Sequence, residues 1–138
     1  MSQADTAAEL GSRINILEEA YEFMLAYASQ GLSSDQGSDT GRQAREYLTR
    51  CDAALSGLAD FLNAFSDRSG AEPIAPYRAF IAVMDRDARD AQAAIQLVLA
   101  QPGISSQLVD NLNASIHLRA LLTDLFLIDE VFKTRARS

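Results

Sequence analysis

The stretch from residue 118 to residue 132 constrains the fold of this chain more than any other. It carries apolar residues at alternating steps of three and four, which places them on one side of an α-helix: Leu118, Leu121, Leu125, Ile128 and Phe132. Further apolar residues lie on other sides of the same helix: Leu122, Phe126, Leu127 and Val131. A helix that is apolar on several sides must be covered from several directions. We therefore expect it to be the central helix of a bundle or a helix shared with a second subunit.

Three earlier segments show the same helical periodicity, and no segment shows the alternation typical of a β-strand. The sequence thus predicts an all-α protein with one domain, residues 1–138. We expect helices over residues 6–30, 41–66, 76–101 and 106–134. Because the predicted connections are short, these helices should form an antiparallel up-down-up-down four-helix bundle.

Local signals set the predicted helix ends. Thr6 with Glu9, and Thr40 with Gln43, have the spacing of a capping box at the start of a helix. Pro76 suits the first turn of the third helix, and Ser105 or Ser106 can cap the fourth. Residues 31–41 are polar, contain glycine and lack periodicity, so they predict a flexible loop.

Composition excludes several classes of partner. The 138 residues carry a formal net charge of −7, which disfavours binding to nucleic acid or to an anionic membrane surface. The apolar residues of the last helix are interrupted by too many charges for a membrane span. The N-terminal residues lack the pattern of a secretory signal, and the chain has one cysteine, so we expect a cytoplasmic protein.

Cys51 lies within an apolar stripe and should be a buried, unreactive thiol.

One alternative is a metal site borne on helical carboxylates. Asp124 lies seven residues after His117, the one histidine, on the same side of the predicted fourth helix. An antiparallel bundle would bring Asp87 and Glu18 to a similar height, giving a candidate layer of His117, Asp87, Asp124 and Glu18. Ferritin-like di-iron proteins use two Glu-x-x-His pairs, however, and here residue 114 is Ala.

A second alternative rests on the acidic run Glu18-Glu19-x-x-Glu22. It resembles the EExxE element of the all-α nucleotide pyrophosphohydrolases, which implies Mg²⁺ held by carboxylates against a triphosphate. That family also has an E-x-x-D motif, whereas this chain has only Asp87-x-x-Asp90, further downstream. If the run has no functional role, it is simply the side of a helix that faces solvent.

A third alternative is phosphotransfer through His117. Helical phosphotransfer domains place Lys and Gly three and four residues after the histidine, where this chain has Ala120 and Leu121. The sequence therefore lacks the positive charge and the small residue that give access to phosphate and stabilise it.

The interpretation that we favour is a non-enzymatic protein-interaction module, such as a small adaptor, regulator or chaperone-like bundle. We predict no catalytic residue and no cofactor. The first and fourth helices carry more apolar surface than one buried face needs, and such a surplus is usually covered by a partner. The sequence thus predicts a homodimer, or a complex with another protein, through Ile16, Phe23, Tyr27, Val109, Leu112, Ile116 and Leu127.

Overall fold

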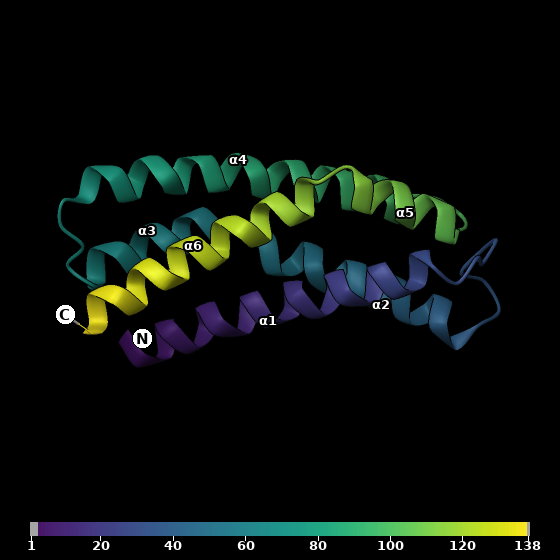
Figure 1. Ribbon diagram of the computed structural model, residues 1–138, viewed down its shortest axis with the longest axis horizontal. Helices are drawn as coiled ribbons and strands as arrows, with labels where there is room; N and C mark the ends of the chain where they lie inside the picture. The colour runs from purple at the N-terminus through teal and green to yellow at the C-terminus, as the bar shows by residue number, and fades with distance from the viewer. Residues whose placement is uncertain (1–2, 138) are drawn as a thin grey trace.

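The computed structural model describes residues 3–137, and every regular element within that range is a helix. There are six helices in that range (Figure 1): α1 Gln3–Ala28, α2 Asp39–Leu55, α3 Leu58–Arg68, α4 Ile74–Leu99, α5 Ser106–Ala114 and α6 His117–Arg137. The all-α prediction is confirmed. None of the helices in the described range is long and apolar enough to cross a membrane.

Six helices replace the predicted four because two predicted helices are interrupted. The first interruption divides the predicted helix over residues 41–66 into α2 and α3. Ser56 has an extended backbone, and Gly57 adopts the left-handed conformation with φ of 67°. Glycine reaches this conformation without the steric cost that a Cβ imposes, so the chain can turn here and start a new helix.

The second interruption divides the predicted helix over residues 106–134 into α5 and α6. Ile116 lies between them with φ of 63°, a conformation that is sterically costly for a β-branched residue. Neither glycine nor proline is present at this position, so local preference alone would continue the helix. The break follows from packing instead, because α5 lies against α1 while α6 lies mainly against α4.

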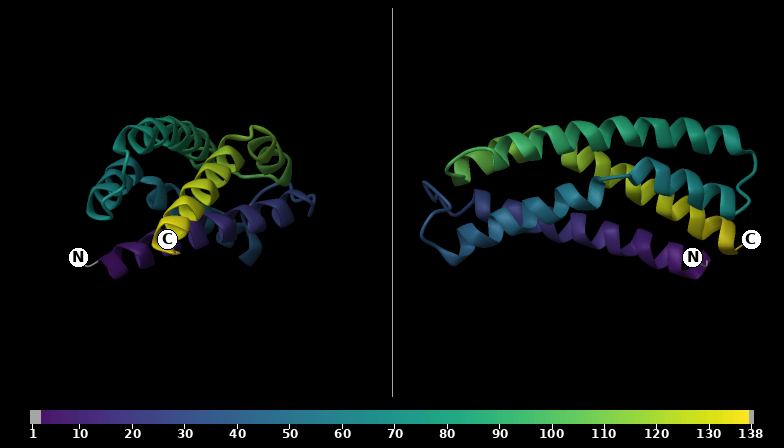
Figure 2. Two further views of the ribbon diagram at one scale, coloured as in Figure 1. Left: turned by 60° about the vertical axis from the view of Figure 1, so that its left-hand side comes forward. Right: turned by 180° about the vertical axis from the view of Figure 1, so that it is seen from behind.

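The helices pack around one elongated core. α1 packs against α2 and α5, and α4 packs against α2, α3 and α6. In Figures 1 and 2, α1 and α4 run along opposite sides of the molecule, and α6 crosses obliquely between them. The apolar stripes read from the sequence line this core, including Leu17, Met24, Leu48, Ile95 and Leu125, each with no exposed surface. Cys51 is fully buried, as predicted.

Some of the predicted helix ends are confirmed and others are displaced. Ser105 caps α5 by accepting a hydrogen bond from the Leu108 N–H, and Pro76 lies in the first turn of α4. Ser38, two residues before Thr40, caps α2 by accepting from the Gly41 N–H. Thr6 lies inside α1 and is buried, so it does not cap that helix.

Candidate protein-interaction groove

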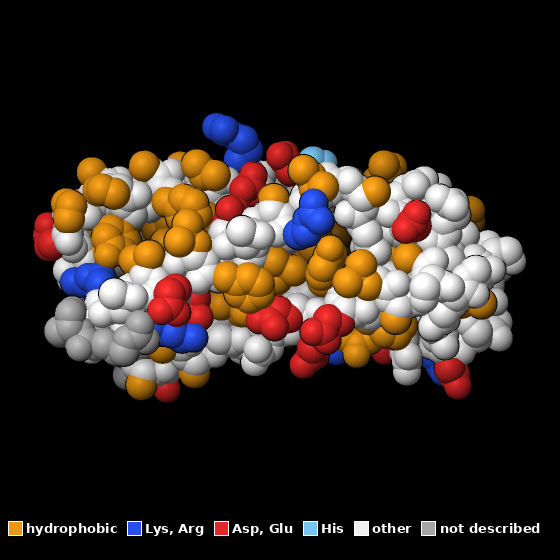
Figure 3. Space-filling view, in the orientation of Figure 1, with side chains coloured by type: hydrophobic (Ala, Val, Ile, Leu, Met, Phe, Trp, Pro, Cys, Tyr) orange, Lys and Arg blue, Asp and Glu red, His pale blue; other side chains and the backbone are white. Residues whose placement is uncertain are grey.

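A groove of about 950 Å³ lies between the first half of α1 and the second half of α6. Its floor is apolar and belongs to the core: Leu10, Ile14, Phe65 and Phe132. The first part of its α1 wall consists of small residues, Ala4, Ala7 and Gly11, and Phe126 lies on its α6 wall. Figure 3 shows hydrophobic side chains in the region where α6 and α1 meet.

The groove exists because α1 presents little side-chain volume where α6 passes over it. Gly11 lies within α1, and a Cβ added there would meet no atom within 4 Å. A glycine inside a helix costs about 0.5–1 kcal/mol of stability relative to alanine, so the presence of Gly11 within α1 needs an explanation. The absence of a side chain at Gly11 leaves open space beside the core residues Leu10 and Ile14.

Large apolar side chains remain exposed on α6 and at its start. Phe126 is 48% exposed, Leu127 is 54% exposed, and Ile116 is 52% exposed. Single exposed leucines are ordinary, but a half-exposed phenylalanine on the wall of an apolar groove is typical of a binding surface.

The structure divides the seven predicted interface residues into three groups. Ile116 and Leu127 are exposed, and Ile16 and Phe23 are partly buried against the core. The remaining three are buried within this chain and are unavailable to a partner: Tyr27, Val109 and Leu112. Burial thus removes Tyr27, Val109 and Leu112 from the predicted set, and Ile116 and Leu127 are its exposed members.

The break at Ile116 explains this correction. With one continuous helix, Val109 and Leu112 would fall behind the face that carries Leu118 and Leu125. The break reorients α5, and both residues join the core beside α1. Tyr27 is covered for a different reason, because its hydroxyl donates a 2.7 Å hydrogen bond to the Ile104 carbonyl.

Charged groups at the groove differ in whether they have partners. Lys133 forms a 2.9 Å ion pair with Asp129 on the next turn of α6. Arg135 donates hydrogen bonds of 3.0 and 2.8 Å to the carbonyls of Ser69 and Gly70, which follow the C-terminus of α3. Glu18 lines the same groove, and within residues 3–137 it has no ion pair. Both cations thus have partners within the chain, whereas Glu18 has no ion pair among the described residues.

The candidate metal layer is brought together only in part. Asp87 of α4 and Asp124 of α6 lie side by side, whereas Glu18 lies in the α1 groove and His117 is exposed at the start of α6. Burial, followed by hydrogen bonding with the Asp87 carboxyl and repulsion from it, raises the pKa of Asp124 to about 7. No group of three or more metal-ligating side chains occurs within residues 3–137. The two carboxyl groups lie close enough that the charge of Asp87 disfavours ionisation of Asp124.

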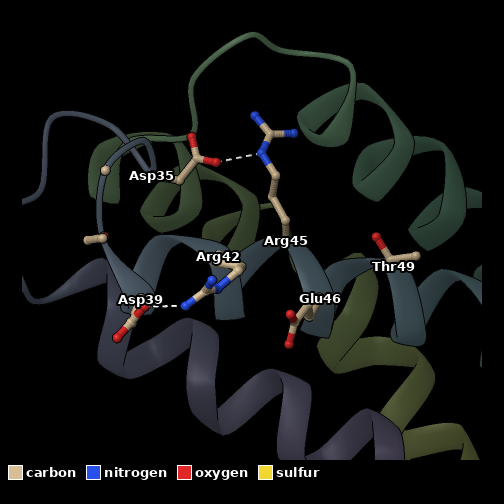
Figure 4. Close-up of a pocket in the computed structure, with 8 residues that line it drawn as sticks. Asp35, Asp39, Arg42, Arg45, Glu46 and Thr49 are labelled. Atoms are coloured by element: carbon tan, nitrogen blue, oxygen red, sulfur yellow. Dashed lines mark hydrogen bonds and ion pairs between the residues drawn. The ribbon is translucent and has the colours of Figure 1, made fainter.

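A second hollow, of about 680 Å³, lies beside the start of α2 (Figure 4). It contains two arginines, each already paired with an aspartate. Arg45 points to Asp35, and Arg42 pairs with Asp39. Because both guanidinium groups are engaged and Glu46 adds a further negative charge, this hollow has no free cation for an anionic ligand.

Asp35 serves the fold instead. Its carboxylate also accepts a 2.6 Å hydrogen bond from the Ile104 N–H. Burial alone would raise the pKa of Asp35, but hydrogen bonds from Arg45 and from Ile104 outweigh it and lower that pKa. Arg45 in turn donates to the carbonyls of Leu99 and Gln101 at 3.1 and 2.8 Å. We call this set of contacts the loop clasp, because it ties residues 31–38 to residues 99–106.

The loop clasp alters the picture of residues 31–41 drawn from the sequence. The Leu32 carbonyl accepts from the Ser106 N–H at 2.8 Å, and the Leu32 N–H donates to the Ser106 hydroxyl at 2.9 Å. Gln36 donates to the Pro102 carbonyl at 2.7 Å. Residues 31–38 form a loop, as predicted, whereas residues 39–41 belong to α2. The loop is held by long-range hydrogen bonds. The residues that hold the segment, Asp35 and Arg45, are present in the sequence, but no motif marks them as a pair, because their pairing depends on tertiary structure.

Comparison of the chain with protein-family models, with curated proteins and with solved structures finds no match.

Proposed function

We propose that this protein is a non-enzymatic interaction module that binds an amphipathic helix of a partner in the groove between α1 and α6. One observation carries the proposal: the groove has an apolar floor and a half-exposed Phe126 on its wall. Grooves of this kind accept the apolar side of a helix, whose residues at positions i, i+3, i+4 and i+7 serve as anchors.

Two features of the groove support the proposal over a small-molecule site. It is elongated, since its α1 wall extends from Ala4 to Glu18, and its charged residues lie on the rim beside the apolar floor. An apolar core with a polar rim is the usual anatomy of a protein interface. The carboxyl pair Asp87–Asp124, by contrast, supplies two carboxylate groups, and no third metal-ligating side chain joins them within residues 3–137.

The test uses a 16-residue synthetic helix with leucines on one side and glutamines on the other. We expect it to shift the amide resonances of Ala7, Gly11 and Phe126 in NMR titrations. The variant Gly11→Leu fills the groove with a side chain for which the backbone has room, and it should abolish these shifts without loss of helicity. Shifts scattered over the whole surface, or unchanged in Gly11→Leu, would refute the proposed site.

A homodimer is a second candidate function, favoured by the exposure of Ile116 and Leu127. We propose that these two residues, and not the buried Val109 and Leu112, lie at its centre. Ile116→Glu and Leu127→Glu should then weaken the dimer with helicity retained. Phe23→Glu is unsuitable, because Phe23 stacks on Tyr47 at 4.6 Å and a charge there would disturb the fold. Light scattering at the monomer mass of 15.0 kDa would refute the dimer.

We further propose that the six helices form an interrupted version of the predicted antiparallel bundle. In this proposal, α2 with α3 and α5 with α6 each take the place of one helix. Their consecutive arrangement in Figure 2 supports it.

A further inference from the structure

We infer that the helix bound in the groove is cationic, with lysine or arginine side chains at the end that lies over Glu18 and Glu22 of α1. This inference rests on the proposed function, and it adds the chemistry of the partner. It also gives a role to the acidic run at residues 18–22, which the sequence alone allows to be interpreted either as a metal-binding motif or as a solvated helix face.

The acidic run faces the groove in part. Glu18 lines the groove, and Glu22 follows one helical turn later on the same side of α1. Neither glutamate has an ion pair within the described residues. Glu19 points about 100° away from Glu18 around the helix axis. In Figure 3, acidic side chains lie along the α1 side of the hydrophobic region.

The cations at the other end of the groove already have partners within the chain. Lys133 is already paired with Asp129, and Arg135 is hydrogen-bonded to the carbonyls of Ser69 and Gly70. A ligand helix therefore meets unpaired carboxylates at one end and, at the other end, cations that are ion-paired or hydrogen-bonded within the chain. This asymmetry places the positive charges of the ligand at one end of its helix.

The charge of the whole chain favours a cationic ligand over a second copy in the groove. A second copy also carries a formal charge of −7, so its approach to Glu18 and Glu22 would be opposed by repulsion. A cationic helix would be attracted, because complementary charge guides encounter and selects partners. The groove thus combines apolar affinity with electrostatic selection.

The groove also sets the length of the ligand. Its α1 wall runs from Ala4 to Glu18. At 1.5 Å per residue, these positions span about 21 Å, or close to four helical turns. A ligand helix of about 15 residues would cover this length.

The experiment compares three 16-residue peptides with the same leucine stripe and with lysine, glutamine or glutamate at the two positions over Glu18 and Glu22. Affinities are measured by calorimetry at about 50 mM and 300 mM salt. We expect the lysine peptide to bind about tenfold more tightly than the glutamate peptide at low salt, and we expect salt to narrow this difference. The glutamine peptide should fall between them and depend little on salt.

Matched variants separate charge from shape. Glu18→Gln with Glu22→Gln should remove the preference for lysine and keep binding of the glutamine peptide. Glu19→Gln removes the same charge from the adjacent side of α1 and should leave the preference in place. Gly11→Leu should abolish binding of all three peptides, with circular dichroism confirming that the protein remains folded.

Each result has one meaning. Equal affinity for the three peptides, or tightest binding of the glutamate peptide, would overturn the cationic ligand and leave the groove as a helix-binding site. Absence of binding by all three peptides would overturn the groove itself. A dimer at micromolar concentration that Gly11→Leu converts to a monomer would show that the occupant is a second copy.

Discussion

Among the glycines of this chain, Gly41 is the one at which an added Cβ would meet the closest atoms. It lies in the first turn of α2, and its N–H is bonded to the capping hydroxyl of Ser38. A Cβ at this position would lie 1.9 Å from the carbonyl oxygen of Asp35 and 2.5 Å from its Cα. These are backbone atoms, which cannot turn aside as a flexible side chain can. Gly41→Ala therefore requires the loop to move away from α2.

The cost can be estimated from the contacts that such a movement disturbs. Forcing extra volume into a closely packed site costs about 1–3 kcal/mol. The displaced residue is Asp35, whose buried carboxylate holds the loop clasp through Arg45 and the Ile104 N–H. Hydrogen bonds to a charged group contribute about 1.5–3 kcal/mol each, and partial loss of one is enough to add to the strain. We expect Gly41→Ala to lower the free energy of unfolding by about 3 kcal/mol.

The matched control is the same substitution at Gly11, where a Cβ meets no atom within 4 Å. Gly11→Ala should raise the free energy of unfolding by about 0.5–1 kcal/mol, because alanine has the higher helix propensity. Urea unfolding followed by circular dichroism at 222 nm measures both variants. A Gly41→Ala variant within 0.5 kcal/mol of the parent protein would refute the close approach of Asp35 to α2.

Three further predictions concern single side chains. The pKa of Asp124 is raised in the folded state, so the stability that its protonated form contributes is present at acidic pH and is lost as pH rises from about 4 to 7. Over that interval Asp124→Asn should gain about 1–2 kcal/mol of stability relative to the parent protein, after allowance for the partial exposure of Asp124. If urea unfolding at pH 4.5 and pH 8 shows no such relative gain, the carboxyl pair is contradicted. Burial, and to a lesser extent the neighbouring Asp52 charge, raise the pKa of Cys51 to about 12, so a thiol reagent at pH 8 should label it slowly in the folded protein and rapidly in urea; fast labelling of the folded protein would show that the thiol is accessible. Ile116→Gly should stabilise the protein by about 0.5–1 kcal/mol by relieving the left-handed conformation, whereas Leu127→Gly, at a similarly exposed helical position, should destabilise it by about 1 kcal/mol in the same urea assay; equal effects would exclude strain at Ile116.

The helical class and most of the core followed from periodicity. Apolar residues at steps of three and four on a helix share one side, so Leu17, Leu48 and Leu125 could be assigned to the core before any tertiary structure was known. The interruption at Gly57 also had a local signal, since a glycine inside an apolar stripe can adopt the left-handed conformation.

The interruption at Ile116 had no such signal. Its position is decided by the different surfaces on which α5 and α6 pack, and the consequence extends to Val109 and Leu112, which move from a predicted interface into the core. The prediction of the candidate metal layer is right for one pair of residues and wrong for the rest, for a related reason. Counting residues along antiparallel helices correctly places Asp87 at the level of Asp124, but the level of a residue does not determine which side of its helix faces inward.

The groove could not be predicted from the periodicity of apolar residues, for another reason. A stripe containing Ala7, Gly11 and Ile14 has the spacing of a core-facing stripe, and spacing carries no information on whether small residues are covered by a neighbouring helix. The hollow depends on the oblique course of α6, which only the assembled structure shows. The loop clasp depends likewise on contacts between segments about 70 residues apart, such as that of Asp35 with Ile104.

The placement of the two chain ends has a practical consequence for any binding measurement. Ala4 and Ala136 both line the groove, and Figure 1 shows both ends of the described chain at that end of the molecule. A purification tag or fusion partner joined to either end therefore leaves the protein beside the groove. A tethered segment is present at an effective concentration on the order of millimolar, so even a weakly apolar or cationic tag competes with a ligand added at micromolar concentration. Affinities measured on tagged protein will underestimate the affinity of the groove, and cleavage of the tag should restore it.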